Sequence, residues 1–183
     1  MMEPPIDGVR IGRLARHSDD RGSFREAWRA SWYADAGQPP PVFVQANVSE
    51  SDAGVLRGLH VHRRQVDHWV VLDGRAFVGL VDVRPVVART GAPVVAVREL
   101  EVDDWLAIPI GVAHGFLALE PLTLLYLVSA EYDGSDELGF AWDDPTASVP
   151  WPTIATTPDG RPLVSERDRA APSLDELIPR LRT

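Results

Sequence analysis

The chain of 183 residues contains no cysteine and no lysine, so all 18 side chains counted as Lys or Arg are arginine. The absence of cysteine excludes a disulfide framework, a thiolate nucleophile and a thiolate metal site. The absence of lysine excludes Schiff-base catalysis and an amine that acts as acid or base. Arginine can still bind phosphates through two parallel hydrogen bonds, so an anionic small ligand remains possible.

Long apolar runs are also missing, and none approaches the ~20 residues that a membrane-spanning helix needs. The N-terminal stretch lacks the apolar core of a signal peptide, which indicates a cytoplasmic protein without a membrane partner. The formal net charge of -9 argues against a nucleic-acid partner, because non-specific binding of phosphates needs a positive surface.

Short apolar runs separated by proline and glycine make up most of the chain, as is typical of an all-β protein. Runs rich in Val, Leu, Ile and aromatic residues predict strands at 41–50, 54–62, 68–74, 75–84, 93–100, 103–110, 114–119 and 122–130. Helical periodicity is limited to residues 24–37, which end at Gly37, and 171–182, where Ser173 and Glu176 form an expected capping box. We expect one domain over residues 1–183, a sandwich, jelly roll or barrel whose body spans about 43–130 and is flanked by arms.

Three histidines stand close together in the stretch LRGLHVHRRQVDHWVVLDG, at residues 56–74. Because alternate residues of a strand point to one face, His60 and His62 can converge on one point. Together with Asp67, and with His114 in IPIGVAHGF, they are candidate ligands for Zn, Fe, Mn or Ni. Both stretches resemble the two cupin motifs in part, so a metal-dependent cupin oxygenase or isomerase is one hypothesis.

A second pattern extends from about residue 19 to 172. Its ordered segments are DDRGSFREAW, FVQANVSES, GVLRGLH, IPIGVAHGF, LLYLVSAEYDGSDELGFAWDDP, and VPWP followed by PLVSERDRAAP. In this order and spacing they resemble the dTDP-4-dehydrorhamnose 3,5-epimerase family. The resemblance implies an all-β, cupin-type double-stranded β-helix (jelly roll) with short helical arms. It also implies an isomerase that uses no metal or other cofactor and acts on a dTDP-sugar in deoxysugar biosynthesis, as in the rhamnose pathway.

The same resemblance implies which residues are catalytic. His60 matches the base, Asp168 matches the carboxylate that pairs with it, and Tyr126 matches the acid. A carboxylate on one imidazole nitrogen selects the tautomer and stabilises the imidazolium that forms on proton uptake. A base and an acid on opposite sides of a carbon next to a ketone would invert that carbon, which in this family is C3 and/or C5 of the sugar.

Further positions match the family's contacts to the substrate. Arg21 and Arg57 match contacts to the diphosphate, Tyr132 matches the residue that stacks on the thymine, and His114 matches a donor to the enolate oxygen. Arg21 would reach into the site of a neighbouring subunit, which implies a homodimer. The remaining matching positions are polar or charged and comprise Glu26, Gln45, Asn47, Glu137 and Arg167.

One departure from the family is the residue that follows Asp67. The family carries a lysine there that is believed to support the enolate, and His68 stands in its place. We count His68 as a candidate substrate-binding residue in that role, although an imidazole is shorter and less basic than lysine. Epimerisation at one carbon only and a non-catalytic sugar-nucleotide binder are therefore alternatives to a full 3,5-epimerase.

Overall fold

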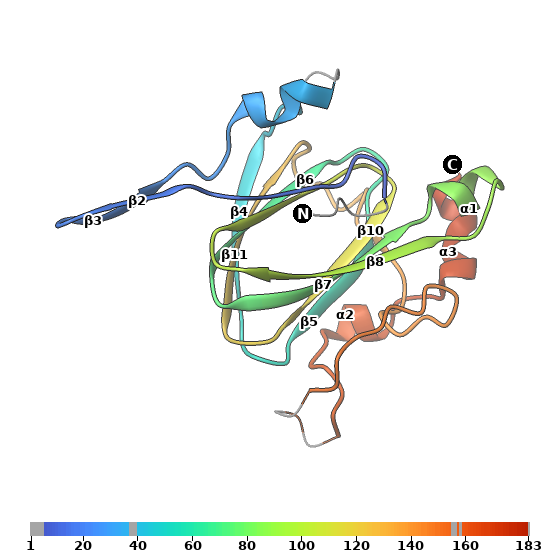
Figure 1. Ribbon diagram of the computed structural model, residues 1–183. Helices are drawn as coiled ribbons and strands as arrows, with labels where there is room; N and C mark the ends of the chain where they lie inside the picture. The colour runs from blue at the N-terminus through green and yellow to red at the C-terminus, as the bar shows by residue number, and fades with distance from the viewer. Residues whose placement is uncertain (1–5, 37–39, 155–156, 158, 183) are drawn as a thin grey trace.

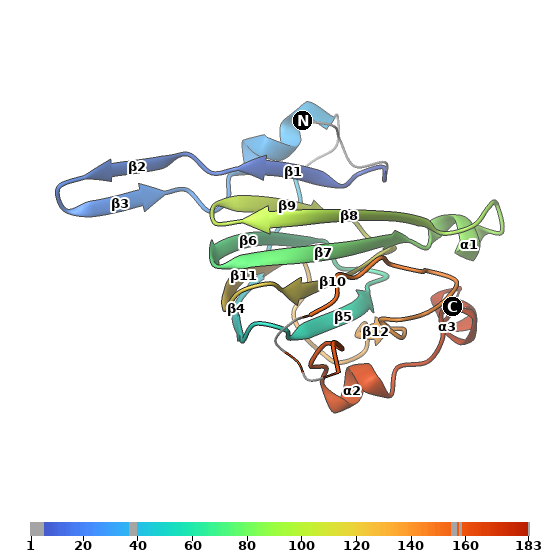
Figure 2. The ribbon, with the colours of Figure 1, turned by 60° about the horizontal axis from the view of Figure 1, so that its bottom comes forward.

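The computed structural model describes residues 6–36, 40–154, 157 and 159–182. Two five-stranded antiparallel sheets lie face to face and form the body (Figure 1; Figure 2). The first sheet has the order β1 (Arg10–Arg13), β9 (Asp104–Ile108), β6 (Asp67–Asp73), β11 (Leu122–Val128) and β4 (Gln45–Ser51). The second has the order β12 (Leu138–Gly139), β5 (Leu56–Val61), β10 (Val112–Ala118), β7 (Arg75–Asp82) and β8 (Val94–Glu101). The predicted jelly roll is confirmed, and each strand expected between residues 41 and 130 is present.

The space between the sheets is filled by alternate residues of the strands. Trp69 and Val71 of β6 meet Val78 and Leu80 of β7 and Phe116 of β10 in one buried apolar cluster. Because neighbouring strand residues point to opposite faces, the residues between these positions lie on the outer faces of the sheets. This alternation decides which polar side chains of β5, β6, β10 and β11 reach the interior.

The outer faces of both sheets are covered by the arms of the chain. Over the first sheet lies the 3-10 helix η1 (Ala30–Ala36), where the ring of Trp32 stacks on Trp105 at 5.4 Å between centroids. Over the second sheet lies α3 (Leu174–Leu181), whose Leu174 and Leu177 are fully buried. The arms thus bury apolar residues that the two sheets alone would leave in water.

The helical predictions are confirmed at one end and partly wrong at the other. At the C-terminal end, Ser173 and Glu176 form the expected capping box of α3. At the N-terminal end, the first residues predicted as helix belong instead to strand β3 (Gly22–Arg25), and Gly37 lies outside the described residues. The short helices α1 (Arg84–Ala88) and α2 (Glu166–Arg169) were not predicted, since one helical turn is too short to show a periodic pattern.

A hairpin formed by β2 (Arg16–Asp19) and β3 projects away from the body (Figure 1; Figure 2). Its base is anchored by Asp103, whose carboxylate accepts two hydrogen bonds from Arg16 at 2.8 and 2.9 Å and lies 2.6 Å from Arg25. Beyond this anchor the strands of the hairpin are largely exposed. No helix among the described residues is long and apolar enough to cross a membrane.

Two glycines allow β5 and β10 to approach closely beside the interior histidines. A Cβ on Gly58 would lie 2.6 Å from the Cα of Gly115, and a Cβ on Gly115 would lie 2.8 Å from the carbonyl oxygen of Arg57. Gly58 also has a φ of +131°, which side-chain-bearing residues rarely adopt. This close approach brings His60 and His114 opposite each other across the two strands.

Candidate active site

The imidazole of His60 on β5 is held by a carboxylate from near the C-terminus. Its Nε2 lies 2.9 Å from Oδ1 of Asp168 on α2. Because an ionised carboxylate only accepts hydrogen bonds, Nε2 carries the proton of this bond and Nδ1 keeps its lone pair. The side chain of His60 is 27% exposed and that of Asp168 only 7%. Within the part of the chain that the structure describes, Nδ1 has no hydrogen-bond partner, so one nitrogen of a partly accessible imidazole can accept a proton.

Asp168 is kept in place and ionised by its surroundings. Its backbone N–H donates to Oγ of Ser165, the N-cap of α2, at 3.0 Å. Burial acts to raise the pKa of Asp168, but the hydrogen bond from His60 and further bonds from Ser165 and the Gly58 backbone lower it below its ordinary value. An anionic Asp168 can stabilise the positive charge that His60 gains when it takes a proton.

Tyr126 reaches the same interior from the opposite sheet. It lies on β11, with Asn47 and Trp69 as its partners on the neighbouring strands, and its ring packs against the interior apolar cluster. Burial raises the pKa of Tyr126, and so does the negative charge of Asp67, whereas Arg57 acts to lower it. The phenol is thus protonated at neutral pH and can donate a proton.

His62, Asp67 and His114 form a buried polar cluster in the interior. Nε2 of His114 lies 3.7 Å from Oδ2 of Asp67, and the rings of His62 and His114 are 5.4 Å apart. The Nδ1–H of His114 donates to the carbonyl oxygen of Val112 at 3.0 Å, and burial lowers the pKa of His114. Neutral His114 therefore presents a lone pair at Nε2, which does not agree with the predicted role as a hydrogen-bond donor to an enolate.

Several of the expected substrate-binding residues lie around this interior on β4, β5 and the loop after β11. Arg57 donates from Nε to Oγ of Ser51 at 3.0 Å. Gln45 donates to Oδ1 of Asn47 at 2.8 Å and accepts from the backbone N–H of Tyr132 at 2.9 Å. Two further expected residues, Arg167 and Glu137, form an ion pair next to Asp168. Nη2 of Arg167 and Oε2 of Glu137 are 2.9 Å apart.

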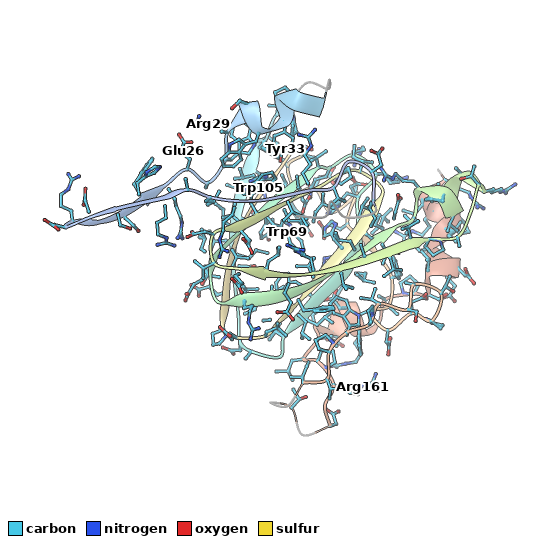
Figure 3. The ribbon with its side chains drawn as sticks, in the orientation of Figure 1. Glu26, Arg29, Tyr33, Trp69, Trp105 and Arg161 are labelled. Atoms are coloured by element: carbon cyan, nitrogen blue, oxygen red, sulfur yellow. The ribbon has the colours of Figure 1, made fainter. Side chains whose placement is uncertain are left out.

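Arg21 and Glu26 lie apart from this group in the single chain. Arg21 is in the turn of the projecting hairpin, with its side chain 90% exposed and paired with Asp19 at 2.6 Å. Glu26 lies at the base of the hairpin, 2.5 Å from Arg29 (Figure 3). Both residues line a groove of about 290 Å³ beside Trp32. In the single chain, the projecting hairpin thus carries Arg21 away from the body (Figure 1).

The structure does not bring His68 to the site, so its expected role as a substitute for the lysine is wrong in this chain. On β6, Asp67 and Trp69 face the interior, and by strand alternation His68 faces the outer side. There it is fully buried beside Tyr33 and Trp105 beneath η1, whereas Trp69 lies in the middle of the body (Figure 3). Both ring nitrogens of His68 are hydrogen-bonded, to Tyr33 Oη at 2.7 Å and to the Ala27 carbonyl oxygen at 3.2 Å.

The hypothesis of a four-ligand metal centre is only partly consistent with this geometry. One potential ligand atom from each of His62, Asp67 and His114 lies within 4.8 Å of the others. His60, the fourth candidate, has its Nε2 bonded to Asp168 instead. The residues thus divide into a histidine–carboxylate pair and a cluster of three potential metal ligands.

Three residues that position the site were not predicted from the sequence. Trp69 donates from Nε1 to Oδ2 of Asp67 at 3.2 Å, Ser51 holds Arg57, and Ser165 holds Asp168. Trp69 could have been found because it is two residues from Asp67 on a strand and therefore shares its face. Ser165 caps the helix that carries Asp168, and Ser51 is separated from Arg57 by the turn between β4 and β5. The sequence alone carries only a weak signal for either contact.

A jelly roll that carries a carboxylate-bound histidine on one sheet and a tyrosine on the other is the arrangement that the resemblance to the epimerase family implies. The family model described as dTDP-4-dehydrorhamnose 3,5-epimerase matches residues 3–176. The chain therefore belongs to the dTDP-4-dehydrorhamnose 3,5-epimerase family and is an isomerase that acts as an epimerase in deoxysugar biosynthesis.

Individual relatives agree with this assignment. The spore coat polysaccharide biosynthesis protein SpsL of Bacillus subtilis is 38% identical over 152 residues, which cover 81% of this chain and 97% of that protein. The solved rmlC epimerase of Mycobacterium tuberculosis superposes with a TM-score of 0.82 at 32% identity, covering 98% of this chain and 92% of that one. ChmJ of Streptomyces bikiniensis, a 3'-monoepimerase solved with dTDP-quinovose, has a TM-score of 0.80 at 30% identity, covering 99% and 91%.

Proposed function

We propose that this protein epimerises a dTDP-4-keto-6-deoxyhexose at C3, C5 or both, with His60 as base and Tyr126 as acid. The observation that carries the proposal is the placement of the two groups on opposite sheets. His60 reaches the interior from β5 with its carboxylate partner at 2.9 Å, and Tyr126 reaches it from β11. A sugar ring bound between the sheets would meet a proton acceptor on one side and a proton donor on the other.

The proposed chemistry follows from the protonation states of these groups. Neutral His60 takes the proton from the carbon next to the C4 ketone, and anionic Asp168 stabilises the imidazolium. The electron pair moves onto the ketone oxygen and forms an enolate. Tyr126 then returns a proton from the other face, so that the carbon is inverted while the sugar keeps its composition. General base catalysis of this kind contributes about 10² to 10⁴ in rate.

The polar residues around His60 suit a nucleotide diphosphate. Arg57 lies near Tyr126, since its charge acts on the pKa of that phenol, and its guanidinium can bind phosphate oxygens bidentately. The exposed ring of Tyr132, with 67% relative accessibility, is available to stack on a base such as thymine. Names of relatives that mention dTDP-sugars support the same substrate class.

A homodimer forms part of the proposal. The hairpin β2–β3 carries Arg21 away from the His60 group of its own chain (Figure 2), so Arg21 can contact a substrate only in a partner. An antiparallel pairing of two chains would place each hairpin against the other body and supply a cationic group to each site. We also keep the sequence-based expectation of a cytoplasmic protein.

The decisive experiment is solvent exchange into dTDP-4-keto-6-deoxyglucose in deuterated water, followed by NMR and mass spectrometry. The protein is expected to introduce deuterium at C3, at C5 or at both, and the labelled position shows which carbon is handled. His60→Ala should abolish exchange, and Tyr126→Phe should reduce it strongly. Absence of exchange with folded wild-type protein would sink the proposal and leave a non-catalytic binder, whereas full activity in both variants would refute the assigned residues.

A further inference from the structure

A pocket of about 720 Å³ lies at the end of the body where α1 and α3 come together (Figure 1). Its wall includes Val61 of β5, which shares an apolar cluster with Leu177 of α3 on the outer side of the second sheet. His60, the preceding residue, points to the inner side of the same sheet. The pocket is therefore separate from the proton-transfer site, and its volume is typical of small-molecule sites, which span about 300 to 1,000 Å³.

The permanently charged residues in the described part of the pocket wall are all arginines. Arg63 and Arg64 come from the loop between β5 and β6, Arg84 begins α1, and Arg182 follows α3. The chain as a whole is acidic, with 27 Asp and Glu residues against 18 arginines. Positive charge is thus concentrated at this pocket, which favours an anionic ligand.

Arg182 differs from the other three arginines in its partners. Carboxylates outside the wall neutralise those three, and the N–O distances of the pairs are 2.7 Å for Arg84–Asp82, 3.6 Å for Arg63–Asp136 and 3.8 Å for Arg64–Asp133. Arg182 donates from Nε and Nη2 to the carbonyl oxygens of Val87 and Val86, both at 3.0 Å. Its positive charge is therefore not neutralised among the described residues, and three of its five N–H groups can bind an anion.

The loop that carries Arg63 and Arg64 is held by one buried carboxylate. Asp136 accepts from the backbone N–H of Arg63 at 3.0 Å and from that of Arg64 at 2.9 Å. Nη2 of Arg64 also donates to Oγ of Ser135, which lies in the pocket wall, at 2.6 Å. Because these bonds fix the loop before a ligand arrives, less conformational entropy is lost on binding.

The rest of the wall is mainly aliphatic. It includes Val87 of α1, Leu181 of α3 and Ile110 of the turn between β9 and β10. Ile110 has a relative accessibility of 41%, although large aliphatic side chains are usually buried. The described wall contains no Phe, Tyr or Trp, so it offers no such ring on which a nucleotide base could stack. An aliphatic ligand body fits this wall better than a nucleoside.

We propose that this pocket binds a small anion with an aliphatic body and one phosphate or carboxylate head group. Arg182 and Arg64 bind the head group, since guanidinium groups form paired hydrogen bonds with either oxyanion. Ile110 and Leu181 contact the body. Binding here is independent of the proposed epimerase function, because the pocket and the proton-transfer site lie on opposite sides of β5.

Asp136 connects the pocket to the proton-transfer site. Its carboxylate holds the arginine loop, and its carbonyl oxygen accepts from the Nδ1–H of His62 at 2.8 Å. The ring of His62 is 5.4 Å from that of His114, which lies opposite His60 across β5 and β10. A ligand that moves the loop therefore acts on the surroundings of His60 and serves as an effector. This role, unlike binding, rests on the proposed epimerase function.

Binding is tested by NMR titration of the isotope-labelled protein with alkyl phosphates and with alkyl carboxylates, each from butyl to hexyl. Inorganic phosphate and hexanol represent the head group and the body alone. The amide signals of Arg64 and Gly111 should shift, and affinity should rise about two- to fourfold per methylene, fourfold being the value for complete burial. Binding of either series supports the site, and the tighter series identifies the head group. Affinity that does not depend on chain length, or displacement of the ligand by dTDP, would overturn the proposal.

Two arginine variants test the head-group contact. Arg182→Gln and Arg64→Gln should each weaken binding of hexyl phosphate about tenfold or more, because a charge-assisted hydrogen bond is lost. Ile110→Thr should lower the gain per methylene. Arg98→Gln is the matched control, since Arg98 is an exposed residue of β8 outside the pocket wall. Circular dichroism checks folding, and Arg64→Gln carries the test if Arg182→Gln is unfolded, because the Arg64 side chain is 60% exposed. Wild-type affinity in the folded arginine variants would overturn the site.

The effector role is measured by deuterium exchange with and without saturating hexyl phosphate. The exchange rate should change by at least about fivefold, the lower end of the coupling usual between two sites. The change should be absent in Arg182→Gln, which separates it from direct competition at the proton-transfer site. Equal rates in the wild type would overturn the effector role, whereas absence of exchange in both states would count against the proposed epimerase function instead.

Discussion

His60 and His68 stand eight positions apart in one stretch of sequence and lie in opposite kinds of surroundings. His60 bonds an anionic carboxylate through Nε2, has no partner at Nδ1 among the described residues, and is partly exposed. His68 has both nitrogens occupied by uncharged partners and is fully buried under aromatic rings on the outer face of the first sheet. Burial lowers the pKa of His68 to about 4, although the bond to the Ala27 carbonyl acts to raise it.

The difference between the two histidines shows what makes an imidazole chemically available. A catalytic base needs one nitrogen without a partner and a neighbour that stabilises the charged form, and His60 has both. His68 has neither, so its contribution is to the stability of the outer layer. Substitutions at the two positions should therefore separate activity from stability.

The largest expected effect is on the activity of a variant at His60. His60→Gln should reduce the rate of deuterium exchange by about 10² to 10⁴, because the proton acceptor is lost. The same substitution at His68 should leave exchange within about twofold of the wild type and reduce the free energy of unfolding by about 2 kcal/mol, since two buried hydrogen bonds are disturbed. Exchange assays and urea denaturation of both variants measure the contrast, and equal losses of exchange would contradict it.

Asp168 is expected to show the next largest effect, through the histidine that it holds. Asp168→Asn keeps an oxygen that can accept from His60 but removes the negative charge that stabilises the imidazolium. We expect a decrease of about 100-fold in kcat with little change in KM, because Asp168 positions the base and does not touch the substrate. Steady-state kinetics would contradict this role if KM rose and kcat stayed constant.

The sequence predicted the fold well because alternation and turn residues act locally. The strands of residues 41–130 and the capping box at Ser173 follow from patterns within a few residues. The misassignment at Phe24 has a physical reason as well. Its segment contains good helix formers, but pairing of β3 with β2 is a tertiary contact that overrides local preference.

The site was predictable where a family pattern covers it and where strand alternation is applied. His60, Asp168 and Tyr126 come from distant parts of the chain, so only the resemblance could suggest that they act together. For His68 the pattern suggested a position in the site, whereas alternation from Asp67 would have placed it on the outer face. The hydrogen bonds that select the tautomers of His62 and His114 involve backbone carbonyls, whose positions no residue pattern specifies.

The pH dependence of stability provides a third test of the comparison. The folded-state pKa of His68 is lowered from 6.5 to about 4, so between these values the unfolded chain binds a proton that the folded protein does not. The contribution of neutral His68 to the free energy of unfolding is fully present above about pH 6.5. This contribution is lost as the pH falls toward 4, by an amount on the order of 3 kcal/mol. Urea denaturation at intervals from pH 7 to 4.5 should show a shallower loss in His68→Phe than in the wild type. Parallel curves would show that His68 does not carry this dependence.

The smallest expected effects come from the groups that hold each histidine or its partner. Tyr33→Phe removes the hydroxyl that donates to His68, and Ser165→Ala removes the cap that holds Asp168. Each should reduce the free energy of unfolding by about 1 kcal/mol. Only Ser165→Ala should also slow deuterium exchange, by several-fold, because a displaced Asp168 no longer orients His60. If Tyr33→Phe slowed exchange equally, the outer aromatic layer and the interior site would be coupled, and the division between the two histidines would not hold.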